Sequence, residues 1–71
     1  MNRIIKQKEI GKYYIALEEF INNHGELDYK VTKDEKVGDM LYQHRGGLIT
    51  NNKTTANNRY YYYCRKAKEE N

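Results

Sequence analysis

A single cysteine, Cys64, is the feature that most limits how this chain can fold, because one thiol cannot form an intrachain disulfide. A chain of 71 residues buries only about 60% of the surface that its unfolded form exposes. Neither a disulfide nor a Cys-rich zinc site compensates for so small a core, so stability has to come from packing or from a partner chain. The cysteine usage favours a reducing compartment such as the cytoplasm. We expect a single domain covering residues 1–71.

The sequence carries no pattern typical of secretion or of membrane insertion. Its first residues, MNRIIKQKEIGKYY, hold only two consecutive apolar residues before Lys6, far fewer than the apolar core of a signal peptide. No apolar run is long enough to cross a bilayer. We therefore expect a cytoplasmic protein without a membrane partner.

Helical spacing of apolar residues marks the segment Gln7–Asn23. At roughly 100° per residue, its large apolar side chains fall within an arc of about 120°: Ile10, Tyr13, Tyr14, Leu17, Phe20 and Ile21. The pattern predicts an amphipathic helix, and Gly25 lies where a C-terminal cap is expected. Ile15 falls on the polar side, where it is interpreted as an isolated exposed residue or as part of a contact with another chain.

A short strand and a second helix are predicted next. Leu27–Val31 alternates apolar and polar residues, as a half-buried strand does. Thr32 and Glu35 then match a capping box, in which each side chain reaches the backbone N–H of the other residue. With Gly46-Gly47 as its end signal, the second helix is predicted over Lys33–Arg45.

The remainder of the chain predicts a β-hairpin. Leu48–Thr50 and Arg59–Arg65 are rich in strand-forming residues, and the polar segment Asn51–Asn58 between them reads as a long, mobile loop. Residues 66–71 are expected to form a frayed, charged tail. The predicted fold class is therefore α+β, with two helices packed on a small antiparallel sheet, a C-terminal β-hairpin, and the order helix, strand, helix, strand, strand.

This order of elements resembles the second half of a winged-helix domain, whose recognition helix is followed directly by a two-stranded wing. Such a domain has a further helix before the recognition helix, whereas the segment Gly25–Thr32 alternates as a strand does. The resemblance implies that outward residues of the second helix would approach a ligand, namely Lys36, Asp39, Tyr42 and Gln43.

Basic and aromatic residues coincide in the second half of the chain. The segment Met40–Lys68 carries six basic residues and no acidic residue, and it contains the unbroken tyrosine run Tyr60–Tyr63. Cations pair with phosphates, and tyrosine faces stack on bases. The combination predicts a nucleic-acid-binding protein with little sequence specificity of its own, and it does not distinguish DNA from RNA.

The candidate binding residues follow from the alternation of side chains along the predicted strand. Cysteine is among the most often buried residue types, so the face with Cys64 is expected to turn inward and the opposite face to meet solvent. The predicted nucleic-acid-binding set contains that exposed face and the basic residues around it: Arg45, Lys53, Arg59, Tyr61, Tyr63, Arg65, Lys66 and Lys68.

A second hypothesis uses the same surface for protein recognition, because tyrosine and arginine are also favoured anchors of protein interfaces. In this alternative the chain is a small inhibitor or adaptor, encoded by a phage or another mobile element, that presents its Tyr/Arg face to a host protein. A homodimer formed through this exposed surface and Ile15 is a variant of it.

Catalytic motifs are weak in this sequence. His24 and His44 could act as an acid and a base in a metal-free ribonuclease, but their neighbours favour structural roles, beside the Gly25 cap and on the predicted apolar face. The two histidines and Cys64 lack metal-ligand spacing. No phosphate-binding glycine loop or serine nucleophile motif is present. We therefore expect no enzyme activity, no metal and no cofactor.

Overall fold

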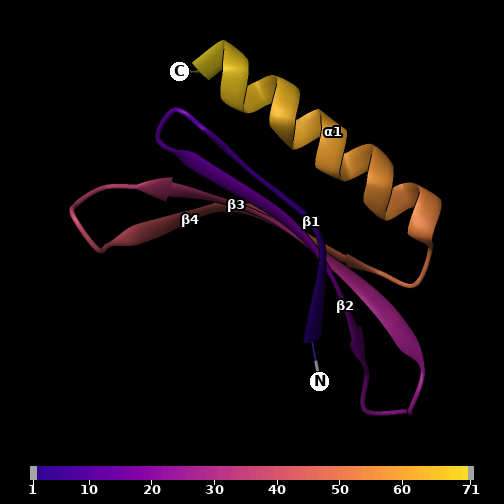
Figure 1. Cartoon of the computed structure of the whole chain (residues 1–71). Helices are drawn as coiled ribbons and strands as arrows, with labels where there is room; N and C mark the ends of the chain where they lie inside the picture. Colours follow the sequence, from indigo (N-terminus) through magenta and orange to yellow (C-terminus); the bar gives the residue numbers. More distant parts are fainter. Residues whose placement is uncertain (1, 71) are drawn as a thin grey trace.

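The computed structural model describes residues 2–70 and places four strands before one helix. The elements are β1 (Asn2–Ile10), β2 (Tyr13–Ile21), β3 (Leu27–Lys36), β4 (Tyr42–Thr50) and α1 (Lys53–Glu70). Each strand pairs antiparallel with the next, so the order in the sheet is β1-β2-β3-β4. Helix α1 lies across one face of this twisted sheet and contacts all four strands (Figure 1).

The hydrophobic core fills the space between α1 and the two central strands. Alternate residues of β2 and β3 point toward the helix, and Ile15, Leu17 and Val31 are completely buried. The helix contributes residues at the spacing of one helical face: Ala56, Tyr60, Tyr63, Cys64 and Ala67. Because the core lies on one side of the sheet, every side chain on the opposite face is without a helical cover in residues 2–70.

Two glycines with positive φ shape the first two connections. Gly11, with φ 58°, begins the two-residue turn that joins β1 to β2, as glycine does in type II′ hairpins. Gly25, with φ 76°, lies in the loop between β2 and β3. Asn22 organises that loop, because its side-chain oxygen accepts hydrogen bonds from the backbone N–H groups of His24 and Glu26 at 2.8 and 3.0 Å.

An asparagine cap fixes the start of α1. The Asn52 side-chain oxygen accepts a 3.0 Å hydrogen bond from the Thr55 N–H, and its backbone carbonyl accepts the first helical hydrogen bond from Ala56. These two bonds are those expected of an N-cap residue. The helix therefore begins directly after β4, and the chain turns sharply to cross the sheet (Figure 1).

The predicted helix over Gln7–Asn23 is wrong, because the segment forms the end of β1 from Gln7, a turn, and the whole of β2. Its apolar residues fit a helical arc, but the same segment also alternates through Tyr13, Ile15 and Leu17, which all face α1. Ile15, predicted as exposed, is fully buried. The alternation and the Gly11 turn prevail because they place these side chains in the core.

The predicted helix over Lys33–Arg45 is also wrong, since it covers the end of β3, a loop, and the start of β4. Thr32 and Glu35 form no capping box there, because both lie in β3 and Glu35 accepts a hydrogen bond from Arg45 instead. Gly46-Gly47 does not end a helix and lies within β4. Without a recognition helix, the resemblance to a winged-helix domain does not hold.

The predicted C-terminal hairpin is wrong as well. Arg59–Arg65 belongs to α1, and so do six residues of the predicted loop, 53–58, and residues 66–70 of the predicted tail. Asn71 lies outside the described residues. The strands predicted over Leu27–Val31 and Leu48–Thr50 are confirmed as parts of the longer β3 and β4. The fold is therefore an antiparallel sheet followed by one helix, in place of two helices with a hairpin.

Candidate functional site

The tyrosine run divides around the helix and does not alternate between two faces of a strand. Tyr60 and Tyr63 turn toward the sheet and are only 6% and 7% exposed. Tyr61 and Tyr62 point outward and are 50% and 42% exposed. The predicted stripe that joins Tyr61 and Tyr63 on one exposed face is therefore wrong, because a turn of 100° per residue separates side chains two positions apart.

A groove runs between β1 and the flank of α1 that carries Tyr61. It has a volume of about 550 Å³ and is lined by Lys6, Lys8, Tyr60, Tyr61, Cys64, Arg65 and Lys68. Four of these seven residues are basic and none is acidic. The groove thus combines concentrated positive charge with an exposed aromatic ring, and it is the candidate functional site of the chain.

The register of β1 directs two lysines into this groove. Lys6 and Lys8 pair with Leu17 and Ile15 of β2, whose side chains lie in the core under α1. Residues directly opposite each other in an antiparallel pair share a face of the sheet, so both lysines lie on the helix side. A register shift between Ile4 and Lys6 sets this alignment.

Lys6 fixes the position of the Tyr61 ring. Its ammonium group donates hydrogen bonds to the Tyr61 hydroxyl oxygen at 2.8 Å and to the Asn57 side-chain oxygen at 3.2 Å. The same nitrogen lies 4.7 Å from the centre of the Tyr61 ring, and Tyr60 packs edge-on against that ring at 5.4 Å. The groove therefore holds one aromatic wall in a defined orientation.

The other three cations of the groove have no acidic partner within residues 2–70. Lys8, Arg65 and Lys68 are exposed and form no ion pair in this part of the chain. By contrast, Arg45 pairs with Glu35 at 3.1 Å and Lys66 with Glu69 at 3.6 Å. Uncompensated cations lining a concave surface attract anions more strongly than cations already paired with carboxylates.

Three of the eight predicted site residues meet in this groove: Tyr61, Arg65 and Lys68. The other five lie elsewhere. Tyr63 is buried, Arg59 donates a 3.4 Å hydrogen bond to its hydroxyl oxygen, and Lys53 is the exposed first residue of α1. Arg45 and Lys66 belong to the ion pairs described above.

Lys6 and Lys8 are absent from the predicted binding set because that set was drawn from the second half of the chain. Lys8 lies in the segment predicted as a helix, Gln7–Asn23, and Lys6 directly precedes it. A signal for them exists in the sequence, since the two lysines are two residues apart and flank Gln7. That spacing places both side chains on the same face of a strand. The spacing indicates a shared face only once residues 2–10 are known to form a strand.

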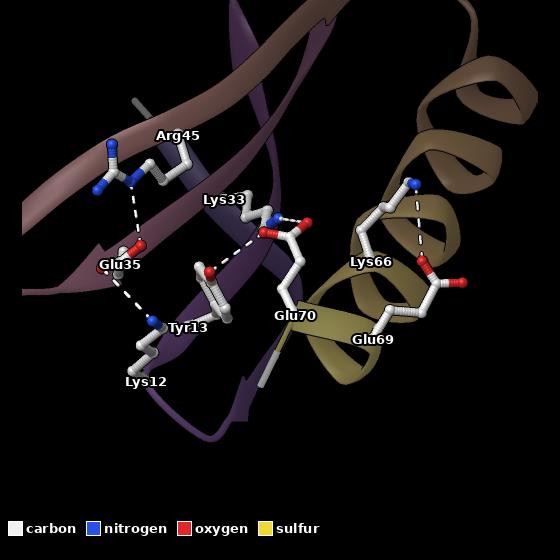
Figure 2. Close-up of polar contacts among 8 residues, drawn as sticks. All are labelled: Lys12, Tyr13, Lys33, Glu35, Arg45, Lys66, Glu69 and Glu70. Carbon is white, nitrogen blue, oxygen red and sulfur yellow. Dashed lines mark hydrogen bonds and ion pairs between the residues drawn. The ribbon is translucent and has the colours of Figure 1, made fainter.

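A second polar cluster lies on the same sheet face, at the C-terminal end of α1 (Figure 2). Lys33, only 6% exposed, forms a 2.8 Å ion pair with Glu70, and the Tyr13 hydroxyl donates to the same carboxylate at 3.1 Å. The hydrogen bond from Lys33 lowers the pKa of Glu70 below its ordinary value. Arg45 lowers the pKa of Glu35 in the same way. Both carboxylates of this cluster, Glu35 and Glu70, are paired with basic side chains, so the cluster serves to attach the end of α1 to the sheet.

The two histidines do not form a joint site. His44 contacts Asp34 at 3.1 Å near one end of β3, whereas His24 lies in the loop before the other end. At about 3.4 Å per strand residue, roughly 20 Å or more of β3 separates them. Across the described residues, no group of three or more His, Cys, Asp or Glu side chains could hold a metal ion.

Comparisons with protein-family models, with curated proteins and with solved structures find no match for this chain. In the part of the chain that the structure describes, α1 is the one helix, and it is not apolar enough to cross a membrane. A functional assignment therefore depends on the geometry and charge of the groove itself.

Proposed function

We propose that the protein binds nucleic acid in the groove between β1 and α1. The observation that supports this most directly is the joint placement of four cations and the half-exposed Tyr61 ring in one groove without a carboxylate. Phosphates of a nucleic acid would pair with the ammonium and guanidinium groups. The phenol ring offers a flat apolar surface to a base.

The binding we propose has little sequence specificity. Lysine and arginine contacts to phosphates fix the position of a strand but carry no sequence information. Stacking on a tyrosine is tolerant of sequence because every base has a flat face. Both DNA and RNA remain candidate ligands, since the groove chemistry suits either backbone.

A reducing compartment such as the cytoplasm is part of this proposal. Cys64 is a buried free thiol that lines the groove. No disulfide forms among the described residues, so the fold gains nothing from an oxidising environment.

The test is a titration of labelled oligonucleotides against the protein, measured by fluorescence anisotropy at several salt concentrations. If all four cations contact phosphates, log K should fall against log salt with a slope of about −3 to −4. The double variant Lys8→Glu with Arg65→Glu should weaken binding and reduce the magnitude of the slope by about 1.5 to 2, because two phosphate contacts are lost.

A control variant of equal charge separates the groove from the net charge of the molecule. Lys30 and Lys36 lie on β3 at positions that alternate with the core residues Tyr29 and Val31, so they occupy the sheet face opposite α1. Lys30→Glu with Lys36→Glu should leave the affinity close to that of the parent protein. Equal losses in both double variants would contradict the proposal.

A second candidate function, contact with another protein, is favoured by the hairpin tip between β3 and β4. Val37, Met40 and Leu41 are 51%, 88% and 66% exposed there, and the tip extends away from α1 (Figure 1). Exposed apolar clusters of this kind are typical of interaction surfaces. A partner captured through this tip should survive nuclease treatment and moderate salt, and it should be lost in the variant Met40→Asp with Leu41→Asp.

A further inference from the structure

We infer that the ligand of the groove is a single strand, because the groove differs from the surfaces that bind duplex nucleic acid. The inference rests on the proposed function and narrows it to unpaired DNA or RNA. It follows from three observations: where the cations lie, how Tyr61 is held, and what the outward surface of α1 carries.

The cations lie in the angle between the helix and the edge strand of the sheet. Lys6 and Lys8 come from β1, and Arg65 and Lys68 come from the facing flank of α1. Their charges therefore converge on a concave groove whose volume, about 550 Å³, lies in the range of small-ligand pockets, roughly 300 to 1,000 Å³. An extended strand can enter such a groove with its phosphates, whereas the convex backbone of a duplex meets only its rim.

The Tyr61 ring is oriented before any ligand arrives. Lys6 holds its hydroxyl oxygen at 2.8 Å, and Tyr60 supports the ring edge-on at 5.4 Å between centroids. A ring fixed in this way loses little conformational freedom when it contacts a base. Bases in a duplex stack on each other and expose only their edges, so a tyrosine face selects bases that are unpaired.

The outward surface of α1 is poorly suited to enter a major groove. Asn58, Tyr62 and Glu69 lie on the side of the helix away from the sheet, and all three are exposed. Glu69 places an exposed carboxylate at the helix end, where it would meet phosphates of a duplex. Arg59 and Lys66 approach the outward Tyr62 ring at 5.8 and 5.9 Å, and Lys66 is paired with Glu69. The larger group of cations, four residues, lies on the β1 flank instead.

The experiment compares a single strand, as DNA and as RNA, with the duplex of the same sequence, using the full chain at one salt concentration. We expect the single strand to bind roughly tenfold or more tightly than the duplex. Tyr61→Leu should weaken single-strand binding by about 5- to 150-fold, the loss expected for one base–aromatic stack. Duplex binding by the same variant should stay within about twofold, because it does not use the stack.

The neighbouring Tyr62→Leu variant is the matched control, because Tyr62 is 42% exposed and lies outside the groove. It should leave single-strand affinity within about twofold.

The outcomes separate this inference from the function on which it rests. Equal or tighter duplex binding would overturn the single-strand inference and leave nucleic-acid binding in place. An equal loss in Tyr61→Leu and Tyr62→Leu would also overturn it. No detectable binding to any strand or duplex would overturn the proposed function itself.

Discussion

Two adjacent glycines in β4 have different neighbours, although both lie in the same strand. A Cβ added at Gly46 would lie 3.0 Å from the hydroxyl oxygen of Tyr63 and 3.3 Å from the adjacent ring carbon. Tyr63 is buried and is also held by Arg59. A Cβ at Gly47 would instead lie 3.1 Å from His44, whose side chain is 63% exposed and has room to move.

Gly46→Ala should therefore destabilise the fold, whereas Gly47→Ala should be close to neutral. The cost at Gly46 is expected to be about 1 to 3 kcal/mol, the range for overpacking a core. Urea unfolding followed by circular dichroism gives both values under the same conditions. Equal stability of the two variants would show that the Tyr63 ring yields without cost and that the helix is not closely packed on β4.

At the scale of elements, the Glu70 side chain attaches the C-terminal end of α1 to the sheet, and this attachment is strongest when the Glu70 carboxyl group is ionised. Lys33 and Tyr13 both donate hydrogen bonds to Glu70, and Lys33 is almost completely buried (Figure 2). The pKa of Glu70 is lowered in the fold, first by the hydrogen bond from Lys33. A carboxyl whose pKa is lowered by folding stabilises the protein above its unfolded pKa, about 4.3 for glutamate.

The free energy of unfolding should accordingly fall as the pH drops below about 4.3 and through the lowered pKa of Glu70. Glu70→Gln should reduce stability at neutral pH and make the loss of stability in acid smaller. Some acid dependence should persist in this variant, because the pKa of Glu35 is also lowered. The measurement is the urea midpoint between neutral and acidic pH. Glu69→Gln, at an exposed pair with Lys66, serves as the control and should change the profile little.

Helices and strands could be predicted from the sequence only where the apolar residues fit one periodicity, either strand alternation or helical spacing. Leu27–Val31 alternates without a competing helical stripe, and it forms part of β3. The segment before it supports both periods, and burial of Ile15 under α1 decides between them. That contact joins residues far apart in the sequence, so local patterns do not contain it.

The helix itself had a sequence signal that the β-propensity of tyrosine obscured. Asn52 stands three residues before Thr55, as an N-cap does, and the small or aromatic core residues follow at helical spacing: Ala56, Tyr60, Tyr63, Cys64 and Ala67. Only part of the binding site could be predicted, because some of its residues are brought there by strand pairing. Tyr61, Arg65 and Lys68 were identified by charge and aromaticity, whereas Lys6 and Lys8 depend on the register of β1.

At the scale of the whole molecule, stability rests on a core that occupies one face of the sheet. Ile15→Ala should cost about 2 to 5 kcal/mol, because the side chain is fully buried between β2 and α1. That is a large part of the roughly 5 to 15 kcal/mol that stabilises a typical domain. Ile49→Ala, at a position that is 62% exposed, should change stability by about 0.5 kcal/mol or less. Comparable losses at the two isoleucines in chemical denaturation would contradict the one-sided core.

Charge is also distributed by face over the whole molecule. The groove between β1 and α1 gathers cations that form no ion pair within residues 2–70, while the cluster at the end of α1 pairs its carboxylates with bases. The tip between β3 and β4 is apolar and lies away from α1 (Figure 1). A nucleic acid and a protein partner would therefore contact different surfaces, and one experiment can locate either.

That experiment is a titration of the isotope-labelled protein with a short single-stranded oligonucleotide, followed through backbone amide chemical shifts. Binding in the groove predicts shifts concentrated at Lys6, Lys8, Tyr61, Arg65 and Lys68, with the amides of residues 37–41 unchanged. Shifts concentrated at residues 37–41 or on the uncovered sheet face, with the groove amides unmoved, would contradict nucleic-acid binding between β1 and α1.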